Sequence, residues 1–403
     1  MSDPAQPAPE AALSARESGA APEAYVAGVL AADRSWLART ITLVESALVT
    51  DRTLAAEVLE RLAPHAADSH RVGVTGPPGA GKSTLIDALG ARLCEQGRRV
   101  AVLAVDPSSA RGGGSILGDK TRMARLASAP EAFVRPSPTG GMLGGVTGAT
   151  LEAVEVVEAA GYDVVFIETV GVGQSEAGVA DVCDTVLTVT VPAGGDELQG
   201  IKRGLFELTD VLVVNKADGD LAAAAQRAVA DYAAALRLLH PRGPSEPGEH
   251  GEAGSASWAP PVLAASACEG SGLGELWAQL EAHAQARRAA GQWSVRRGDQ
   301  RVRWMWHLTE RQFMAALRQA PRVQGLLPAL TEQVRTGQLR PAQAAAQLTR
   351  LAAAEPESQH GREGQARSGV RTEPGRGASW GERGDLSGLD GAVGPSSRSP
   401  RRS

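Results

Sequence analysis

The sequence predicts an α/β fold, a doubly wound and mostly parallel sheet with helices on both faces. The first observation is a series of short apolar runs, rich in β-branched residues, that alternate with helical segments as parallel strands buried on both faces do. The second is a glycine-rich loop between the first run and the helical segment after it. The expected strands are residues 71–76, 99–106, 162–169, 184–191, 210–216 and 261–267.

Helical segments flank this predicted domain on both sides. Apolar residues recur at helical spacing ahead of it, and a second helical stretch that contains VRWMW follows it. Proline and acidic residues dominate the start of the chain, and Gly, Ser, Arg and Pro dominate its end. In order, we expect a disordered N-terminus (1–23), an N-terminal helical extension (24–67), the α/β domain (68–290, with a surface insertion at 240–257), a C-terminal helical arm that forms a dimer (291–354) and a disordered tail (355–403).

The composition limits the classes of partner. The net charge of −5 leaves no basic excess for a nucleic-acid partner. The three cysteines have no metal-binding spacing, which favours a reducing compartment. The N-terminus lacks the pattern of a signal peptide, and no apolar run approaches the roughly 20 residues of a membrane span. We expect a cytoplasmic protein that binds neither nucleic acid nor membrane.

The glycine-rich loop GPPGAGKST has the pattern and the strand-to-helix setting of a phosphate-binding loop. Its glycines allow backbone N–H groups to wrap the phosphates, and the helix that follows offers its positive N-terminal end. Lys82 is expected at the β- and γ-phosphates, and the Ser83 hydroxyl at Mg²⁺. The motif alone does not separate ATP from GTP. The loop consists of Gly76, Pro77, Pro78, Gly79, Ala80, Gly81, Lys82, Ser83 and Thr84.

The NKAD sequence favours GTP. It places Asn215, Lys216 and Asp218 just past an expected strand. An ionised Asp218 only accepts hydrogen bonds, and guanine presents two adjacent donors where adenine has none at N1. The apolar stem of Lys216 can lie over the base. At the next strand end, the backbone of Ser266, Ala267 and Cys268 can meet the guanine O6, with Cys268 interpreted as a small packing residue.

Three carboxylates are candidates for the Mg²⁺ shell, and with Lys82 they are the expected catalytic groups. Glu168 ends the strand expected beside the phosphate-loop strand, and Asp106 ends another. Asp119 lies in a glycine-rich loop suited to a nucleotide-ordered switch. Gly171 is expected to sense the γ-phosphate through its backbone N–H. For Gln174 we favour a switch or interface role over water positioning, because its spacing differs from that of small GTPases.

The motifs GPPGAGKST, VDPSS, GGSILGDKTRM, FIETVGVGQSE, PAGGDELQGIKRG and NKAD occur in an order that resembles the MeaB/ArgK family of P-loop GTPases. The resemblance covers about Trp36 to Leu351. It implies a slow, homodimeric GTPase chaperone that uses GTP and Mg²⁺ to gate adenosylcobalamin delivery to, and protection of, a cobalamin-dependent methylmalonyl-CoA mutase. It also places the metal and switch carboxylates on Asp106, Asp119 and Glu168. Finally, it implies that the loop with Asp196, Glu197 and Lys202 relays the nucleotide state to the mutase.

Two other enzyme classes remain as alternatives. One is a nucleotide-dependent kinase of a transport system, although NKAD argues against ATP as the donor. The other is a metal-insertion GTPase, although the seven histidines lie apart and no C-x-x-C or His-rich run occurs. A helical scaffold with a vestigial nucleotide domain is disfavoured by the complete set of motifs.

Overall fold

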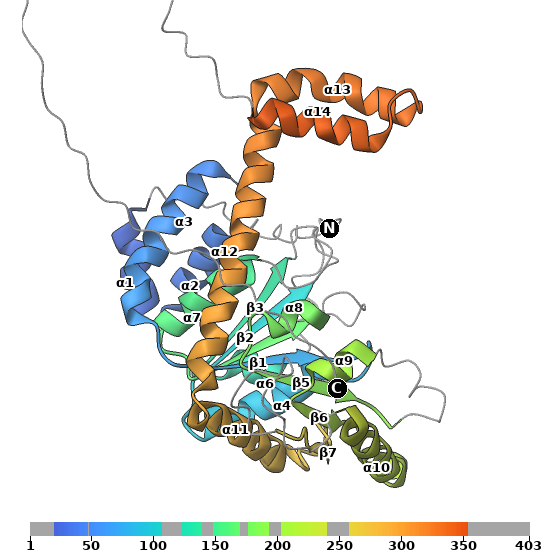
Figure 1. The fold of residues 1–403 in the computed structure, drawn as a ribbon. Coiled ribbons are helices and arrows are strands. Elements are labelled where there is room, and N and C mark those ends of the chain that lie inside the picture. The colour runs from blue at the N-terminus through green and yellow to red at the C-terminus, as the bar shows by residue number, and fades with distance from the viewer. Residues whose placement is uncertain are drawn as a thin grey trace, which may run out of the picture. The chain divides into compact units, whose positions relative to one another are not determined.

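A seven-stranded sheet forms the centre of the molecule (Figure 1). In this computed structural model its strands are all parallel, in the order β3-β2-β4-β1-β5-β6-β7. The predicted α/β class is therefore confirmed. The structure describes residues 20–46, 48–106, 123–138, 148–169, 176–192, 203–239 and 258–353.

Six of the seven strands fall on the apolar runs of the sequence, and β3 was not predicted. It is an edge strand with the sequence AFVRPSP, and its prolines, which cannot donate to a ladder, are tolerated at an edge. Those prolines also remove the sequence signal of a strand. The strands are β1 (His70–Thr75), β2 (Val100–Asp106), β3 (Ala132–Pro138), β4 (Val164–Thr169), β5 (Thr185–Thr190), β6 (Val211–Val214) and β7 (Val262–Ala264).

Helices cover both faces of the sheet. The helices of the described residues are α1 (Pro22–Leu30), α2 (Arg34–Glu45), α3 (Val49–Leu62), α4 (Lys82–Glu95), α6 (Ala124–Ser128), α7 (Gly148–Ala159), α8 (Glu176–Ala180), α9 (Arg203–Leu208), α10 (Ala222–Leu239), α11 (Leu273–Ala289), α12 (Gln292–Gln319), α13 (Pro321–Arg335) and α14 (Pro341–Ala353), the last two of which belong to a separate unit. Two short 3₁₀ turns, η2 (Ala63–His65) and η5 (Gly219–Leu221), complete the described elements. In the part of the chain that the structure describes, no helix is long and apolar enough to cross a membrane.

The alternation of side chains along the strands divides the core into two layers. On β4, Val165 and Ile167 pack with α7 and the N-terminal helices, whereas Val164 and Phe166 pack with α4 and α11. All of these side chains are buried, because each strand is covered on both faces. The N-terminal helices are thus part of the main core, and α2 packs directly on α7.

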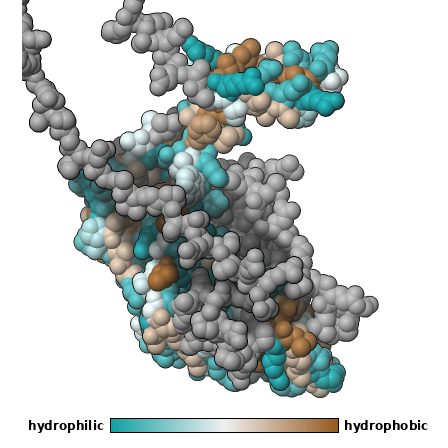
Figure 2. All heavy atoms as spheres, in the orientation of Figure 1, coloured by the Kyte–Doolittle hydropathy of each residue, from teal (hydrophilic) through white to brown (hydrophobic). Residues whose placement is uncertain are grey.

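The described chain separates into two compact units, Met1–Arg318 and Gln319–Ser403. Nearly all of α12 belongs to the first unit. The described part of the second unit is a hairpin of α13 and α14 that buries Val323, Leu330 and Ala344. Its surface carries apolar patches among polar ones (Figure 2), and Leu326 is 45% exposed there.

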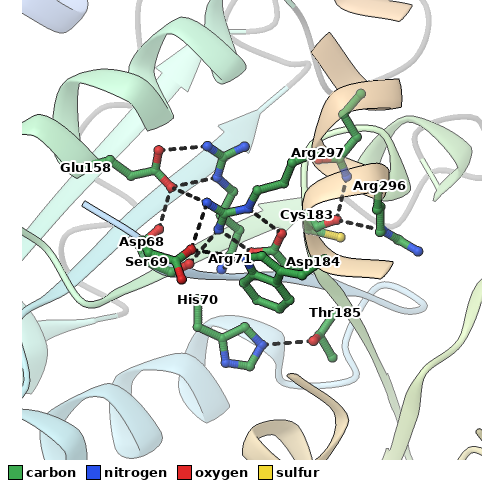
Figure 3. A network of polar contacts seen from close by, with 12 residues as sticks. Asp68, Ser69, His70, Arg71, Glu158, Cys183, Asp184, Thr185, Arg296 and Arg297 are labelled. Atoms are coloured by element: carbon green, nitrogen blue, oxygen red, sulfur yellow. Dashed lines mark hydrogen bonds and ion pairs between the residues drawn. The ribbon is translucent and has the colours of Figure 1, made fainter. Parts of the chain in front are cut away.

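An ion-pair network lies at the amino ends of β1 and β5 (Figure 3). Arg71 donates two hydrogen bonds to Glu158, both of 2.7 Å. Arg297 donates to both carboxylate oxygens of Asp184 at 2.9 and 2.7 Å. Asp184 also accepts from the backbone N–H of Arg71 at 2.9 Å. The network therefore joins the sheet to α7 and to the start of α12.

His70 begins β1 beside this network. Its Nε2 lies 2.8 Å from the Thr185 hydroxyl, which in turn lies 2.8 Å from Nδ1 of His283. The indole rings of Trp277 and Trp293 lie against the imidazole, with centroid distances of 5.8 and 6.0 Å. Burial in these surroundings lowers the pKa of His70 to about 4.

His70 should therefore make the folded protein less stable as the pH falls from 6.5 toward 4. In that window the unfolded chain binds a proton that the folded chain does not, so acid favours unfolding. The loss from this group is about 3 kcal/mol at pH 4. Denaturant unfolding of wild type and His70→Gln at pH 7 and pH 4 measures it, and the variant should lose about 3 kcal/mol less.

Comparing the two proteins removes other titrating groups. Burial raises the pKa of Glu155 to about 7, so this carboxyl contributes the opposite slope in both proteins. If wild type and His70→Gln lose the same free energy of unfolding between pH 7 and pH 4, His70 is not held neutral.

Candidate nucleotide-binding site

The glycine-rich loop begins where β1 ends, at the centre of the sheet. Gly76 has φ of 139°, and a Cβ on it would lie 2.0 Å from the Val189 carbonyl oxygen of β5. Gly81 has φ of 84° and precedes the first residue of α4. A Cβ on Gly81 would lie 2.6 Å from Nδ2 of Asn215. Side chains at these two positions would clash and strain the backbone, so the close approach of the loop to its neighbours requires glycine.

Lys82 is the first residue of α4, and its side chain reaches back across the loop. Its Nζ donates to the carbonyl oxygens of Gly76 at 2.8 Å and Pro77 at 3.1 Å. The side chain is buried, so its ammonium group is held beside the loop. A fixed positive charge beside a glycine-rich loop at a helix N-terminus favours binding of a polyanion.

Ser83 and Glu168 meet at the carboxyl ends of β1 and β4. The Ser83 hydroxyl donates to Oε1 of Glu168 at 2.7 Å. The strands bring them together, because β1 and β4 are neighbours and Val74 is in register with Glu168. A hydroxyl and a carboxylate oxygen are hard ligands of the kind that Mg²⁺ prefers. This pair therefore fits a magnesium ion at the edge of the phosphate loop.

The structure leaves the other predicted phosphate and metal groups without side-chain detail. The backbone of Asp106 ends β2, next to β4, but its side chain is outside the described residues. Asp119, Gly171 and Gln174 also lie outside the described residues, as do the relay-loop residues Asp196, Glu197 and Lys202. Their assigned roles stay predictions.

Asn215 links the phosphate loop to the loop after β7. Its Nδ2 donates to the Ala80 carbonyl at 2.9 Å, and its Oδ1 accepts from the backbone N–H of Ala267 at 3.2 Å. The side chain is 1% exposed, so both hydrogen bonds are shielded from water. This bridging role was not predicted from the sequence, because its two partners lie 135 and 52 residues away.

Asp218 is oriented by Ser266. The Ser266 hydroxyl donates to Oδ2 of Asp218 and accepts from the backbone N–H of Glu269 at 3.1 Å. Lys216, between Asn215 and Asp218, has φ of 60°, an unusual conformation for a residue with a side chain. From the sequence we expected only backbone contacts of Ser266, and this side-chain role was not predicted. Its one available signal was a serine in the last expected strand, and the structure places it two residues past the end of β7.

Cys268 corrects one sequence-based interpretation. It is exposed, although its position after an expected strand predicted a small packing residue. The neighbouring Ala267 is 5% exposed and faces the core, and the turn after it carries Cys268 outward. The two other cysteines, Cys94 and Cys183, are buried.

Comparisons with known proteins agree with this geometry. The sequence model of the family described as methylmalonyl Co-A mutase-associated GTPase MeaB matches residues 37–322. A probable GTPase of Mycobacterium tuberculosis is 52% identical over 320 residues, 79% of this chain and 92% of that protein. The mitochondrial methylmalonic aciduria type A homolog of Mus musculus is 43% identical over 328 residues, 79% of this chain and 76% of that protein. A crystal structure of an LAO/AO transport system kinase is 33% identical, with a TM-score of 0.61 over 83% of this chain and 98% of that one.

Proposed function

Because the chain belongs to the MeaB family of methylmalonyl-CoA mutase-associated GTPases, we propose that its GTP hydrolysis gates adenosylcobalamin delivery to, and protection of, a methylmalonyl-CoA mutase. The chain is a P-loop GTP hydrolase. The observation that carries the proposal is the joining of the phosphate loop to the Asn215–Asp218 segment through buried hydrogen bonds. This arrangement positions a carboxylate acceptor at a fixed place relative to the phosphates.

In this proposal Asp218 reads the base. Its carboxylate accepts from N1–H and the N2 amino group of guanine, while Ser266 holds it in place. Lys216 covers the base plane with its apolar stem. The backbone N–H groups of Ser266 and Ala267 were expected at the guanine O6, but they donate to the Ser271 carbonyl at 3.0 Å and to Asn215 Oδ1 at 3.2 Å. We therefore assign the O6 contact to the backbone N–H of Cys268. The phosphates are held by the backbone of residues 76–84 and by Lys82.

Mg²⁺ fits the hydroxyl of Ser83 and the carboxylate of Glu168, which already lie 2.7 Å apart. We assign Asp106 and Asp119 to the same metal shell and Gly171 to sensing of the γ-phosphate. A bound Mg²⁺ would neutralise charge on the β- and γ-phosphates during hydrolysis. Lys82 supplies a second positive charge there from within the chain.

We further propose a homodimer formed through α12. Val302, Met305, Trp306 and Phe313 are 54%, 50%, 59% and 54% exposed, which supports an apolar surface that a second copy covers. Val302, Trp306 and Phe313 are spaced by four and seven residues, and Met305 lies three residues after Val302, so the four share one side of the helix. Light scattering at micromolar concentration should give the mass of a dimer, and a monomer mass would contradict this assignment.

The two alternative functions have weaker support. The kinase name belongs to a similar solved structure. The Asp218 carboxylate accepts hydrogen bonds from guanine, which argues against ATP as the source of a transferred phosphate. A metal-insertion GTPase needs a cluster of metal ligands. Among the described residues no group of three or more His, Cys, Asp or Glu is placed to hold a metal.

Asp218→Asn should weaken GTP binding and favour xanthine nucleotides, because the amide offers a donor to the acceptor that xanthine has at that edge. We expect at least roughly a hundredfold change in the GTP-to-XTP preference. Calorimetry with GTP, XTP and ATP measures it. Equal affinity of the wild type for ATP and GTP would contradict the assignment of Asp218.

A purified cobalamin-dependent methylmalonyl-CoA mutase should accelerate GTP hydrolysis by this protein, because a partner can complete a GTPase site that is slow alone. Asp196→Ala, Glu197→Ala and Lys202→Ala should blunt that acceleration and GTP-gated cofactor transfer. Their hydrolysis rates without the mutase should stay near wild type. The GTPase rate with and without the mutase is the measurement.

Two controls give this experiment its meaning. Lys82→Ala should abolish hydrolysis under both conditions, because the charge at the phosphates is removed. A mutase that leaves the wild-type rate unchanged and receives cofactor without regard to nucleotide would sink the proposed function. Full acceleration in all three loop variants would remove the loop as the relay.

A further inference from the structure

The first half of α12 holds the chain that connects α8 to β5 through side-chain hydrogen bonds. Gln300 is 1% exposed, and its Nε2 donates to the carbonyl oxygen of Cys183 at 2.7 Å and to that of Ala180 at 3.2 Å. Arg296, one turn earlier, reaches the same two carbonyls at 3.3 and 3.5 Å. Figure 3 shows Arg296 directed toward Cys183. Two side chains of one helix therefore hold two backbone carbonyls of another segment.

One of these carbonyls ends a helix, and the other, that of Cys183, lies between α8 and β5. Ala180 is the last residue of α8, and the final carbonyls of a helix have no intrahelical donor. A cation near such an end, like the guanidinium of Arg296, is favourable. Arg303 adds an ion pair to Asp181 at 2.9 Å. The face of α12 formed by residues 296, 300 and 303 thus follows the segment from 180 to 183.

The same segment is wedged against the strand that carries the phosphate loop. Val179 of α8 is fully buried, and it faces Gly73 of β1. A Cβ on Gly73 would lie 2.5 Å from a Val179 methyl carbon and 2.8 Å from the Cys183 sulfur. Glycine at position 73 therefore makes room for the side chains of Val179 and Cys183, so α8 packs closely on β1.

α8 is also the next described element after the metal-site residue Glu168. At the upstream end, Glu168 accepts from Ser83, and the Thr169 hydroxyl donates to the Val74 carbonyl at 3.3 Å. The next described residue is Glu176, the first of α8. The β4 end is therefore tied to β1. α8 packs on β1, β4, β5 and α9, and side chains of α12 bind the carbonyl at its end.

The N-terminal end of α12 is held in place by its own contacts. Arg297 donates to Asp184 and to the Ser69 carbonyl at 2.6 Å, and it lies over the Trp293 ring at 4.9 Å. Asp68 accepts from the Trp293 indole N–H at 3.0 Å. Because its N-terminal end is fixed, α12 can hold α8 in one place. A loosely attached α12 would instead move together with α8.

We propose that Gln300 and Arg296, assisted by Arg303, are positioning residues for GTP hydrolysis. They act through the segment from α8 to β5: by holding the carbonyl of Ala180, at the end of α8, and that of Cys183, they set where the chain resumes after Glu168. They touch neither the phosphate loop nor the base-side segment. Their loss should therefore slow the hydrolytic step and spare nucleotide binding.

The first test replaces Gln300 with Met, which keeps the length of the side chain and removes both donated hydrogen bonds. The matched control is Gln312→Met, at an exposed position of the same helix. We expect kcat for GTP to fall roughly tenfold in Gln300→Met, because small displacements near a reacting group slow the reaction strongly. The Kd for GDP should stay within roughly twofold of wild type, and Gln312→Met should match wild type in both.

The second test avoids the core. Arg303 and Asp181 are 48% and 41% exposed, so charge reversals there are compatible with folding. Arg303→Asp should lower kcat, and adding Asp181→Arg in the same chain should restore it by re-forming the pair in reverse. Both tests use the full chain without any partner protein, so they stand or fall independently of the mutase.

The outcomes separate a positioning role from a purely structural one. Unchanged kcat in folded Gln300→Met overturns the proposal. Parallel losses of thermal stability, GDP affinity and kcat in Gln300→Met also overturn it, because they show general loosening of the domain. If Gln300→Met does not fold, the decision rests on the exposed pair. There, a kcat that the double reversal fails to restore contradicts the proposal.

Discussion

The place of β1 between β4 and β5 is the constraint on which the whole site depends. In a parallel sheet all strands present their carboxyl ends at one edge, and here the phosphate loop leaves that edge at its centre. β4 can then bring Glu168 to Ser83, and β5 brings the Val189 carbonyl so close that only glycine fits at position 76. The strand order therefore determines which groups of β4 and β5 lie next to the phosphate loop.

Asn215 extends this constraint across the sheet. It belongs to the end of β6, two strands from β1, and its amide joins the Ala80 carbonyl to the Ala267 N–H. A buried amide that loses one partner leaves an unsatisfied polar group, at a cost of about 1–3 kcal/mol. The phosphate side and the base side are therefore held at one separation. Ser266 then fixes the direction of the Asp218 carboxylate, which removes orientational freedom before any ligand binds.

The amino ends of the strands do not form the nucleotide site but anchor helices to the sheet. Arg71, Glu158, Asp184 and Arg297 are nearly buried there and satisfy one another. Breaking one such pair typically costs about 3–5 kcal/mol, because the remaining charge stays buried. A well-packed apolar cluster can supply as much stability as these ion pairs. We therefore interpret the ion pairs as setting the orientation of α12. The arginines set which side of this helix faces the domain, and its Gln300 then faces the carbonyls of Ala180 and Cys183.

The sequence by itself determined the class of the fold, six of the seven strands, the phosphate loop and the base-side motif. These features are local: hydrophobic runs and glycine spacing act over a few neighbouring residues, and the chain records them directly. Tertiary structure alone decided the bridging by Asn215, the orientation of Asp218 by Ser266, the outward turn of Cys268, and the grip of α12 on α8. Each of these depends on partners that are distant in the chain, such as Gln300 and Cys183 at a separation of 117 residues. Only the packing of the sheet and its helices brings such groups within hydrogen-bonding distance, and no local pattern encodes that meeting.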